Sequence, residues 1–166
     1  MKKVGIILIV IAVIAQTSCA GARVDYLSCF EGAFRCEFAY RSESLEYRAA
    51  LYMGKGEIKL SFLEPESLCG IEVSRREGQT LLELSDISIN GGAAEAFLSV
   101  TRFFEFETEV ISAERTLKNN EEYELIRVGN KRGDICELLF VPSTRLPARI
   151  SSNGAEIHII SFEGLE

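Results

Sequence analysis

The stretch YRAALYMGKGEIKLSFL, residues Tyr47 to Leu63, decides the fold of this chain. Two strand-like runs flank Gly54-Lys55-Gly56, and glycine-containing loops of this length are typical of β-hairpins. In the second run Ile58, Leu60 and Phe62 alternate with polar residues, which is the period-two pattern of a strand with one buried and one solvated face. The stretch therefore predicts an antiparallel hairpin with one apolar face.

The same pattern returns three times further along the chain. Each instance is a pair of short apolar runs around turn residues, and Asn153-Gly154 in the last one is a favoured pair for a tight turn. Turn signals every 8 to 12 residues are typical of antiparallel sheet. We expect hairpins at Ile71–Ser74 with Thr80–Leu84, around the turn 75–79, at Tyr123–Val128 with Ile135–Val141, and at Ala148–Ile150 with Glu156–Phe162.

One segment, Ala93 to Phe106, breaks this pattern. Its apolar residues recur at spacings of three and four, which predicts an amphipathic helix. The stripe consists of Ala93, Ala96, Phe97, Val100, Phe103 and Phe104. A helix with this stripe must cover an apolar surface, and the concave face of the sheet offers one. We expect an α+β fold that is mainly antiparallel β, with the helix packed on the sheet.

Length and composition limit the classes of function. The chain has 166 residues, a formal net charge of −7 and one histidine. This length suits one domain, and an apolar content of 47% supports a packed core. An acidic chain lacks the positive field that nucleic acid requires. A single histidine excludes a multi-histidine metal site and catalysis that needs two histidines.

The first residues read as an export signal. Met1-Lys2-Lys3 is basic, and the apolar run Val4–Ala15 would span roughly 18 Å as a helix, short of the roughly 30 Å of a bilayer core. Thr17-Ser18-Cys19 resembles the lipobox of bacterial lipoproteins, in which the cysteine is acylated, although Gln16 replaces the usual aliphatic residue. Cleavage after Ala20-Gly21-Ala22, or no cleavage, remains an alternative.

This reading divides the chain into three parts. They are a signal peptide (1–18), an anchor with a short linker or N-terminal helix (19–32) and a folded domain (33–166). In each alternative the domain leaves the cytoplasm. The main expectation is a membrane anchor through acylated Cys19, and the alternative is a soluble secreted protein.

Two stretches resemble a known family. Phe62–Ile71 (FLEPESLCGI) and Leu138–Ile150 (LLFVPSTRLPARI) are similar to segments of the periplasmic lipoprotein-carrier, or LolA-like, superfamily. The first is a strand followed by proline and a Leu-x-Gly segment, and the second a strand followed by a Thr-x-Leu-Pro stretch. The resemblance extends from about Phe34 to Phe162. It implies an open half-barrel, a curved meander sheet with the helix on its concave face, and a cavity for acyl chains or a partner protein.

Seven residues are candidates for the lining of such a cavity. Alternation or helical periodicity places them on inward faces, and they are Phe38, Tyr40, Leu60, Phe62, Phe97, Val100 and Phe104. The same residues would equally fill a packed core, because sequence patterns do not separate a pocket lining from core packing. Both readings stay open from the sequence.

The cysteines point to structure rather than chemistry. Cys29, Cys36, Cys69 and Cys136 remain after Cys19, and in an exported domain they allow two disulfides with three possible connectivities, or inert buried thiols. The spacing from Cys29 to Cys36 matches neither a redox CxxC pair nor a zinc knuckle. We expect neither a metal nor a cofactor.

No residue pattern indicates catalysis. His158 has no Gly-x-Ser-x-Gly motif to provide a nucleophile. The carboxylates lie in polar runs and are expected on a solvated face: Glu105, Glu107, Glu109, Glu121, Glu122 and Glu124. The sequence therefore predicts a non-enzymatic envelope protein that binds acyl chains or a lipidated client. The alternative is a structural or sensory module with a filled core that binds another envelope protein.

Overall fold

The structure, a computed structural model, describes residues 26–130 and 133–165. In this part of the chain eleven strands form a single sheet in the order β6-β5-β4-β3-β2-β1-β11-β10-β9-β8-β7. The strands are β1 (Ala33–Arg41), β2 (Glu46–Gly54), β3 (Glu57–Glu64), β4 (Ile71–Arg76), β5 (Gln79–Leu84), β6 (Ile87–Asn90), β7 (Phe106–Lys118), β8 (Glu121–Asn130), β9 (Ile135–Phe140), β10 (Pro147–Ser152) and β11 (Ala155–Leu165). Short 3-10 turns lie at η1 (Ser28–Phe30) and η2 (Glu66–Leu68).

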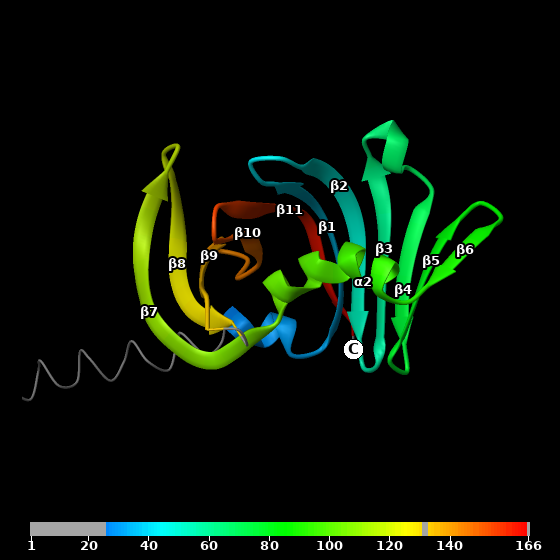
Figure 1. Cartoon of the computed structure of the whole chain (residues 1–166). Helices are drawn as coiled ribbons and strands as arrows, with labels where there is room; N and C mark the ends of the chain where they lie inside the picture. The colour runs from blue at the N-terminus through cyan, green and yellow to red at the C-terminus, as the bar shows by residue number, and fades with distance from the viewer. Residues whose placement is uncertain (1–25, 131–132, 166) are drawn as a thin grey trace, which may run out of the picture.

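The sheet consists of two meanders joined at its centre. Strands β1 and β11 pair antiparallel there, from Ala33 opposite Leu165 to Arg41 opposite Glu156. Strands β6 and β7 follow each other in the chain but form opposite edges of the sheet. The segment between them must therefore cross the whole width of the sheet, and Figure 1 shows it in front of the curved strands.

We call this crossing segment the strap, and it consists of α2 (Gly92–Phe97) and the 3-10 helix η3 (Leu98–Phe104). It begins after Gly91, whose φ of 92° is a backbone conformation that glycine adopts without steric cost. The Gly91 N–H donates a hydrogen bond to the Thr80 carbonyl of β5. The entry of the strap is thereby fixed to the edge of the sheet.

The predicted hairpins are confirmed. Strands β2 and β3 pair around Gly54-Lys55-Gly56, and Ile58, Leu60 and Phe62 are buried on one face as their alternation predicts. The other three predicted hairpins correspond to the strand pairs β4 with β5, β8 with β9, and β10 with β11. The predicted turn 75–79 is wrong at its ends, because Arg75, Arg76 and Gln79 belong to the strands.

The expected α+β class is wrong. The described residues are mainly antiparallel β in one open sheet, and α2 has six residues. The predicted helix Ala93–Phe106 changes to a 3-10 helix at Leu98, and Phe106 already begins β7. Ala96, which was placed in the apolar stripe, is exposed. What the structure does contain is a curved antiparallel sheet with a short helix on one face.

Local chemistry explains why the α-helix ends early. Val100, Thr101, Phe103 and Phe104 have side chains with restricted χ1 angles, which lowers their helix propensity. The Thr101 hydroxyl donates a hydrogen bond to the Leu98 carbonyl at 2.8 Å, a local bond that competes with α-helical geometry. A 3-10 helix repeats every three residues, and Leu98, Thr101 and Phe104 are accordingly all buried.

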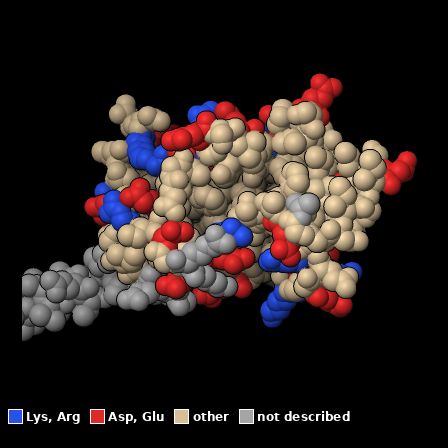
Figure 2. Space-filling view, viewed as in Figure 1, with Lys and Arg blue, Asp and Glu red and all other residues tan. Residues whose placement is uncertain are grey.

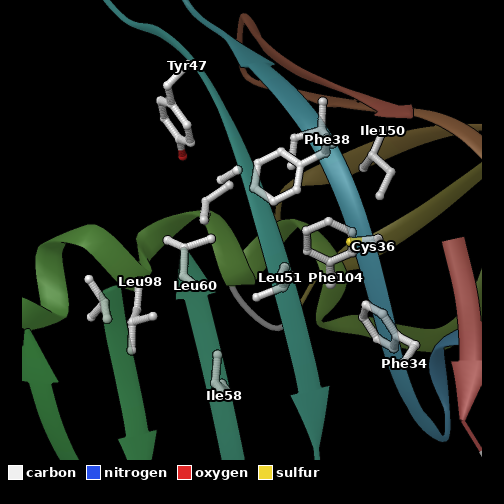
Figure 3. Close-up of a cluster of buried hydrophobic side chains, with 14 of the residues drawn as sticks. Phe34, Cys36, Phe38, Tyr47, Leu51, Ile58, Leu60, Leu98, Phe104 and Ile150 are labelled. Carbon is white, nitrogen blue, oxygen red and sulfur yellow. The ribbon is translucent and has the colours of Figure 1, made fainter. Parts of the chain in front are cut away.

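The core lies between the sheet and the strap. Figure 3 shows Phe34, Phe38 and Leu60 of β1 and β3 close to Phe104 and Leu98 of the strap. No helix among the described residues is long and apolar enough to cross a membrane. The predicted signal peptide (1–18) and Cys19 lie outside the described residues. Of the segment 19–32 the structure describes residues 26–32, in which Tyr26 and Leu27 are helical and η1 follows directly.

Candidate binding face under the strap

Aromatic rings fill the space between the strap and the concave face. All ten phenylalanines of the chain take part in ring contacts. With Tyr26, Tyr40 and Tyr47 they form one connected network, which we call the aromatic seam. Offset and edge-to-face pairs of this kind contribute about 0.5–1.5 kcal/mol each beyond their burial. The seam therefore holds the strap on the sheet.

Three phenylalanines of the strap make these contacts. The Phe97 ring lies 5.7 Å from the Phe62 ring of β3, and the Phe103 ring lies 6.1 Å from Tyr40 of β1. Phe104 is the deepest, with ring centroids of Phe34 and Phe38 at 5.7 and 5.9 Å. The strap is thus attached at several points across the sheet.

The structure brings the seven predicted lining residues to the same face. Phe38, Leu60, Phe62, Val100 and Phe104 are buried, and Tyr40 and Phe97 are half-buried. All seven belong to one packed hydrophobic cluster. Whether they also contact a ligand stays a prediction.

Sequence reasoning did not select several members of this face. Phe30 contacts five other rings from η1, and Tyr47 links Phe38, Tyr40 and Phe62. Burial raises the pKa of Tyr47 well above its ordinary value, with a smaller contribution from Tyr40. The alternation of Tyr47 with Ala49 and Leu51 was the available signal for its inward position.

Two hollows flank the strap. One, of about 280 Å³, lies between η1 and the end of the strap and is lined by Phe30, Met53, Phe104 and Phe106 together with acidic residues. The other, of about 230 Å³, lies beside Phe103 near β9 and β10. Both are smaller than the roughly 300–1,000 Å³ of typical ligand pockets. A bound acyl chain would therefore need part of the space that the strap occupies.

Charged side chains gather mainly around the margins of this face and on the opposite face. Figure 2 shows the middle of the strap side as mostly uncharged. On the convex side of the sheet Arg48 pairs with Glu37 and Glu64, and Lys59 pairs with Glu72 at 2.7 Å. The largest described hollow, of about 890 Å³, is also lined by convex-side residues such as Arg35, Tyr52 and Lys59.

The remaining predicted residues show no catalytic arrangement. Cys29, Cys36, Cys69 and Cys136 are free thiols, and burial raises the pKa of both Cys29 and Cys36 to about 12. His158 is half-exposed and lies 2.7 Å from the Glu156 carboxylate. Among residues 26–130 and 133–165 no group of three or more potential metal ligands is found.

Four of the predicted carboxylates have partners among the described side chains. Glu105 faces Arg75 at 4.0 Å, Glu122 and Glu124 pair with Arg115, and Glu121 accepts a hydrogen bond from Tyr123. The side chain of Glu109 lies outside what the structure describes.

Comparison with known proteins identifies the fold. No protein-family model and no curated protein matches the sequence. An uncharacterized conserved protein from Thermus thermophilus matches with a TM-score of 0.56 and 15% identity, over 89% of this chain and 88% of that chain. MucB matches with a TM-score of 0.54 and 13% identity over 88% of this chain. At these identities the likeness shows a shared fold alone.

This chain spans 60% of the length of MucB. MucB in complex with MucA(peri) also matches, with a TM-score of 0.48 and 14% identity over 87% of this chain and 56% of that chain. A LolA superfamily protein from Nitrosomonas europaea matches with a TM-score of 0.45 and 9% identity, over 87% and 94% of the two chains. These last two likenesses are too distant to carry an argument. The structural neighbours thus include a LolA superfamily protein, while the lipoprotein form stays a prediction.

Proposed function

We propose that this chain is an extracytoplasmic binding protein that holds an apolar chain between the strap and the concave face of the sheet. The apolar chain is an acyl chain of a lipid or of a lipidated client, and no covalent chemistry takes place. Acylation at Cys19 would tether the domain to the membrane. The observation that carries the proposal is that a short strap crosses the concave face and is attached to it through aromatic rings.

The strap depends on its ring contacts because its own helices are short. Isolated helices of fewer than about 12 residues are marginal in water, and α2 and η3 have six and seven residues. If the seam opens, the strap keeps the smaller buried contacts of Ala94, Leu98 and Val100. Displacement of the strap then exposes the rings of β1, β2 and β3 as one continuous apolar surface.

An acyl chain replaces the apolar contacts that this surface loses when the strap leaves it. Each buried methylene contributes about 0.8 kcal/mol, so a chain of about 14 carbons needs roughly 11 kcal/mol of apolar contact to leave a membrane. The rings that the strap covers can supply this contact only if the acyl chain lies along the whole row of rings. The two hollows beside Phe103 and Phe104 provide the places where a chain could enter before the strap moves.

A second function is favoured by a different observation. Leu84, Ile87 and Ile89 are exposed on the edge hairpin β5–β6, at 37%, 60% and 42%, and an exposed apolar edge strand is suited to pairing with another protein. On this alternative the seam is a permanent core and the chain binds an envelope protein at its edge.

Binding of the apolar fluorophore N-phenyl-1-naphthylamine distinguishes the two functions. The full chain carrying Cys19→Ser, which cannot be acylated, is titrated with the probe. Saturable binding is expected, and Phe97→Asp should abolish it, because a charge would then lie against the buried ring of Phe62. The matched control is Ala96→Asp, which adds the same charge at an exposed position on α2. No saturable binding to the Cys19→Ser chain, or equal binding to both aspartate variants, would contradict the proposal.

A further inference from the structure

A polar pair lies within the otherwise apolar concave face. Arg75 of β4 and Thr80 of β5 are directly opposite each other in the sheet. Val73 lies two residues before Arg75, and Leu82 lies two residues after Thr80, so all four side chains share one face of the sheet. Val73 and Leu82 are buried. On β3, the other neighbour of β4, Ile58 lies opposite Arg75. Ile58 in turn lies opposite Met53 of β2. The guanidinium and the hydroxyl therefore continue a row of apolar side chains under the strap.

The Thr80 hydroxyl is buried without a partner. The residue is 5% exposed, and its Oγ1 atom makes no hydrogen bond to the described residues. A buried hydroxyl without a hydrogen bond costs about 1–3 kcal/mol, so such groups are rare unless they have a further role. A ligand acceptor at this point would remove that cost.

Arg75 has a weak ion pair with the residue that directly follows the strap. Its Nη2 atom lies 4.0 Å from Oε1 of Glu105, the residue that ends η3. At this separation the pair is an electrostatic contact rather than a hydrogen bond. When the strap leaves the sheet, Glu105 leaves with it and the guanidinium loses its carboxylate.

A hollow with both apolar and acidic lining residues reaches Glu105, the ion-pair partner of Arg75. Glu105 and Met53 both line the 280 Å³ hollow, together with Phe30, Phe104 and Phe106. Glu31 and Glu107 line it as well, and their charges repel another carboxylate. An acyl chain in the hollow would therefore direct an anionic head toward Arg75.

We infer that Arg75 and Thr80 bind the carboxylate of a long-chain fatty acid, and that Glu105 takes the place of this carboxylate while the strap is docked. This inference rests on the proposed function and adds the class of ligand. The guanidinium donates charge-assisted hydrogen bonds to the carboxylate, and the Thr80 hydroxyl donates a second one. The carboxylate of the fatty acid then replaces the Glu105 carboxylate at Arg75 in a single exchange.

The first test compares two ligands of equal chain length on the Cys19→Ser chain by titration calorimetry. Laurate should bind at least about tenfold more tightly than dodecanol, because hydrogen bonds to charged groups contribute about 1.5–3 kcal/mol. Equal affinity for the two would overturn the inference and leave the proposed function standing. Absence of binding by both would overturn the proposed function together with the inference.

The second test uses variants of the three residues. Arg75→Met should reduce laurate affinity about tenfold or more while dodecanol affinity stays the same, and Thr80→Val should reduce laurate affinity less. Glu105→Gln should increase laurate affinity, because it removes the competing carboxylate; a decrease would overturn its role. The matched control is Arg76→Met, the exposed neighbour on the other side of β4, which should leave both affinities unchanged.

Discussion

Replacing Phe104 by alanine tests whether the strap is part of the folded core. Phe104 is 3% exposed, and the rings of Phe30, Phe34 and Phe38 surround it at 6.2, 5.7 and 5.9 Å. Removing a buried phenylalanine ring typically costs about 3–5 kcal/mol. We expect Phe104→Ala to lower the free energy of unfolding by that amount. For a domain of this size the melting temperature should fall by about 6–20 °C.

The assay is urea denaturation of the Cys19→Ser chain, followed by circular dichroism, with an unchanged m-value as the check that unfolding stays two-state. Phe103→Ala is the matched control within the strap, because Phe103 is half-buried and contacts only the Tyr40 ring among the described aromatic pairs. Its cost should be about half that of Phe104→Ala. A cost below about 1 kcal/mol for Phe104→Ala, or a larger cost for Phe103→Ala, would refute a strap docked on the aromatic seam.

Two further predictions concern titratable groups. Burial raises the pKa of Cys36 to about 12, and Cys69 is exposed; a maleimide should therefore label Cys69 first and Cys36 only after denaturation, and equal labelling rates by mass spectrometry would contradict the buried position. The hydrogen bond from His158 holds the pKa of Glu156 below its ordinary value of 4.5, with help from Arg149 and Arg41. A lowered folded-state pKa stabilises the fold above about pH 4.5 and loses this effect as pH falls through the folded value. His158→Ala should thus flatten the fall in unfolding free energy between about pH 5 and pH 3, measured by urea titration, and an unchanged slope would disprove the linkage.

The hairpins were predictable because their signal is local. Alternation of Ile58, Leu60 and Phe62 fixes both the strand and its buried face within a few residues. Strand β7 gave no such signal, because register shifts between Phe106 and Val110 and between Val110 and Ser112 interrupt its alternation. The pairing of β1 with β11 joins residues from the two ends of the chain, and no local pattern specifies it.

The strap shows why a correct periodicity gave the wrong element. Apolar residues at spacings of three and four are the pattern of an α-helix, and this pattern does not show that bulky side chains disfavour the α-helix beyond Phe97. The inward positions of Phe97, Val100 and Phe104 were still predicted correctly. Thr80 and Arg75 were not selected, because a threonine in a strand carries no sign of burial and an arginine beside a turn carries no sign that it faces inward.

Native mass spectrometry of the full chain carrying Cys19→Ser, as purified from cells, tests the central claim most directly. Because this variant cannot carry its own acyl anchor, any lipid must be bound to the fold. We predict a non-covalent adduct in the mass range of a fatty acid or lipid that organic solvent extracts. A bare polypeptide mass, unchanged after incubation with a membrane extract, would contradict binding under the strap and favour a protein-binding module with a permanent core.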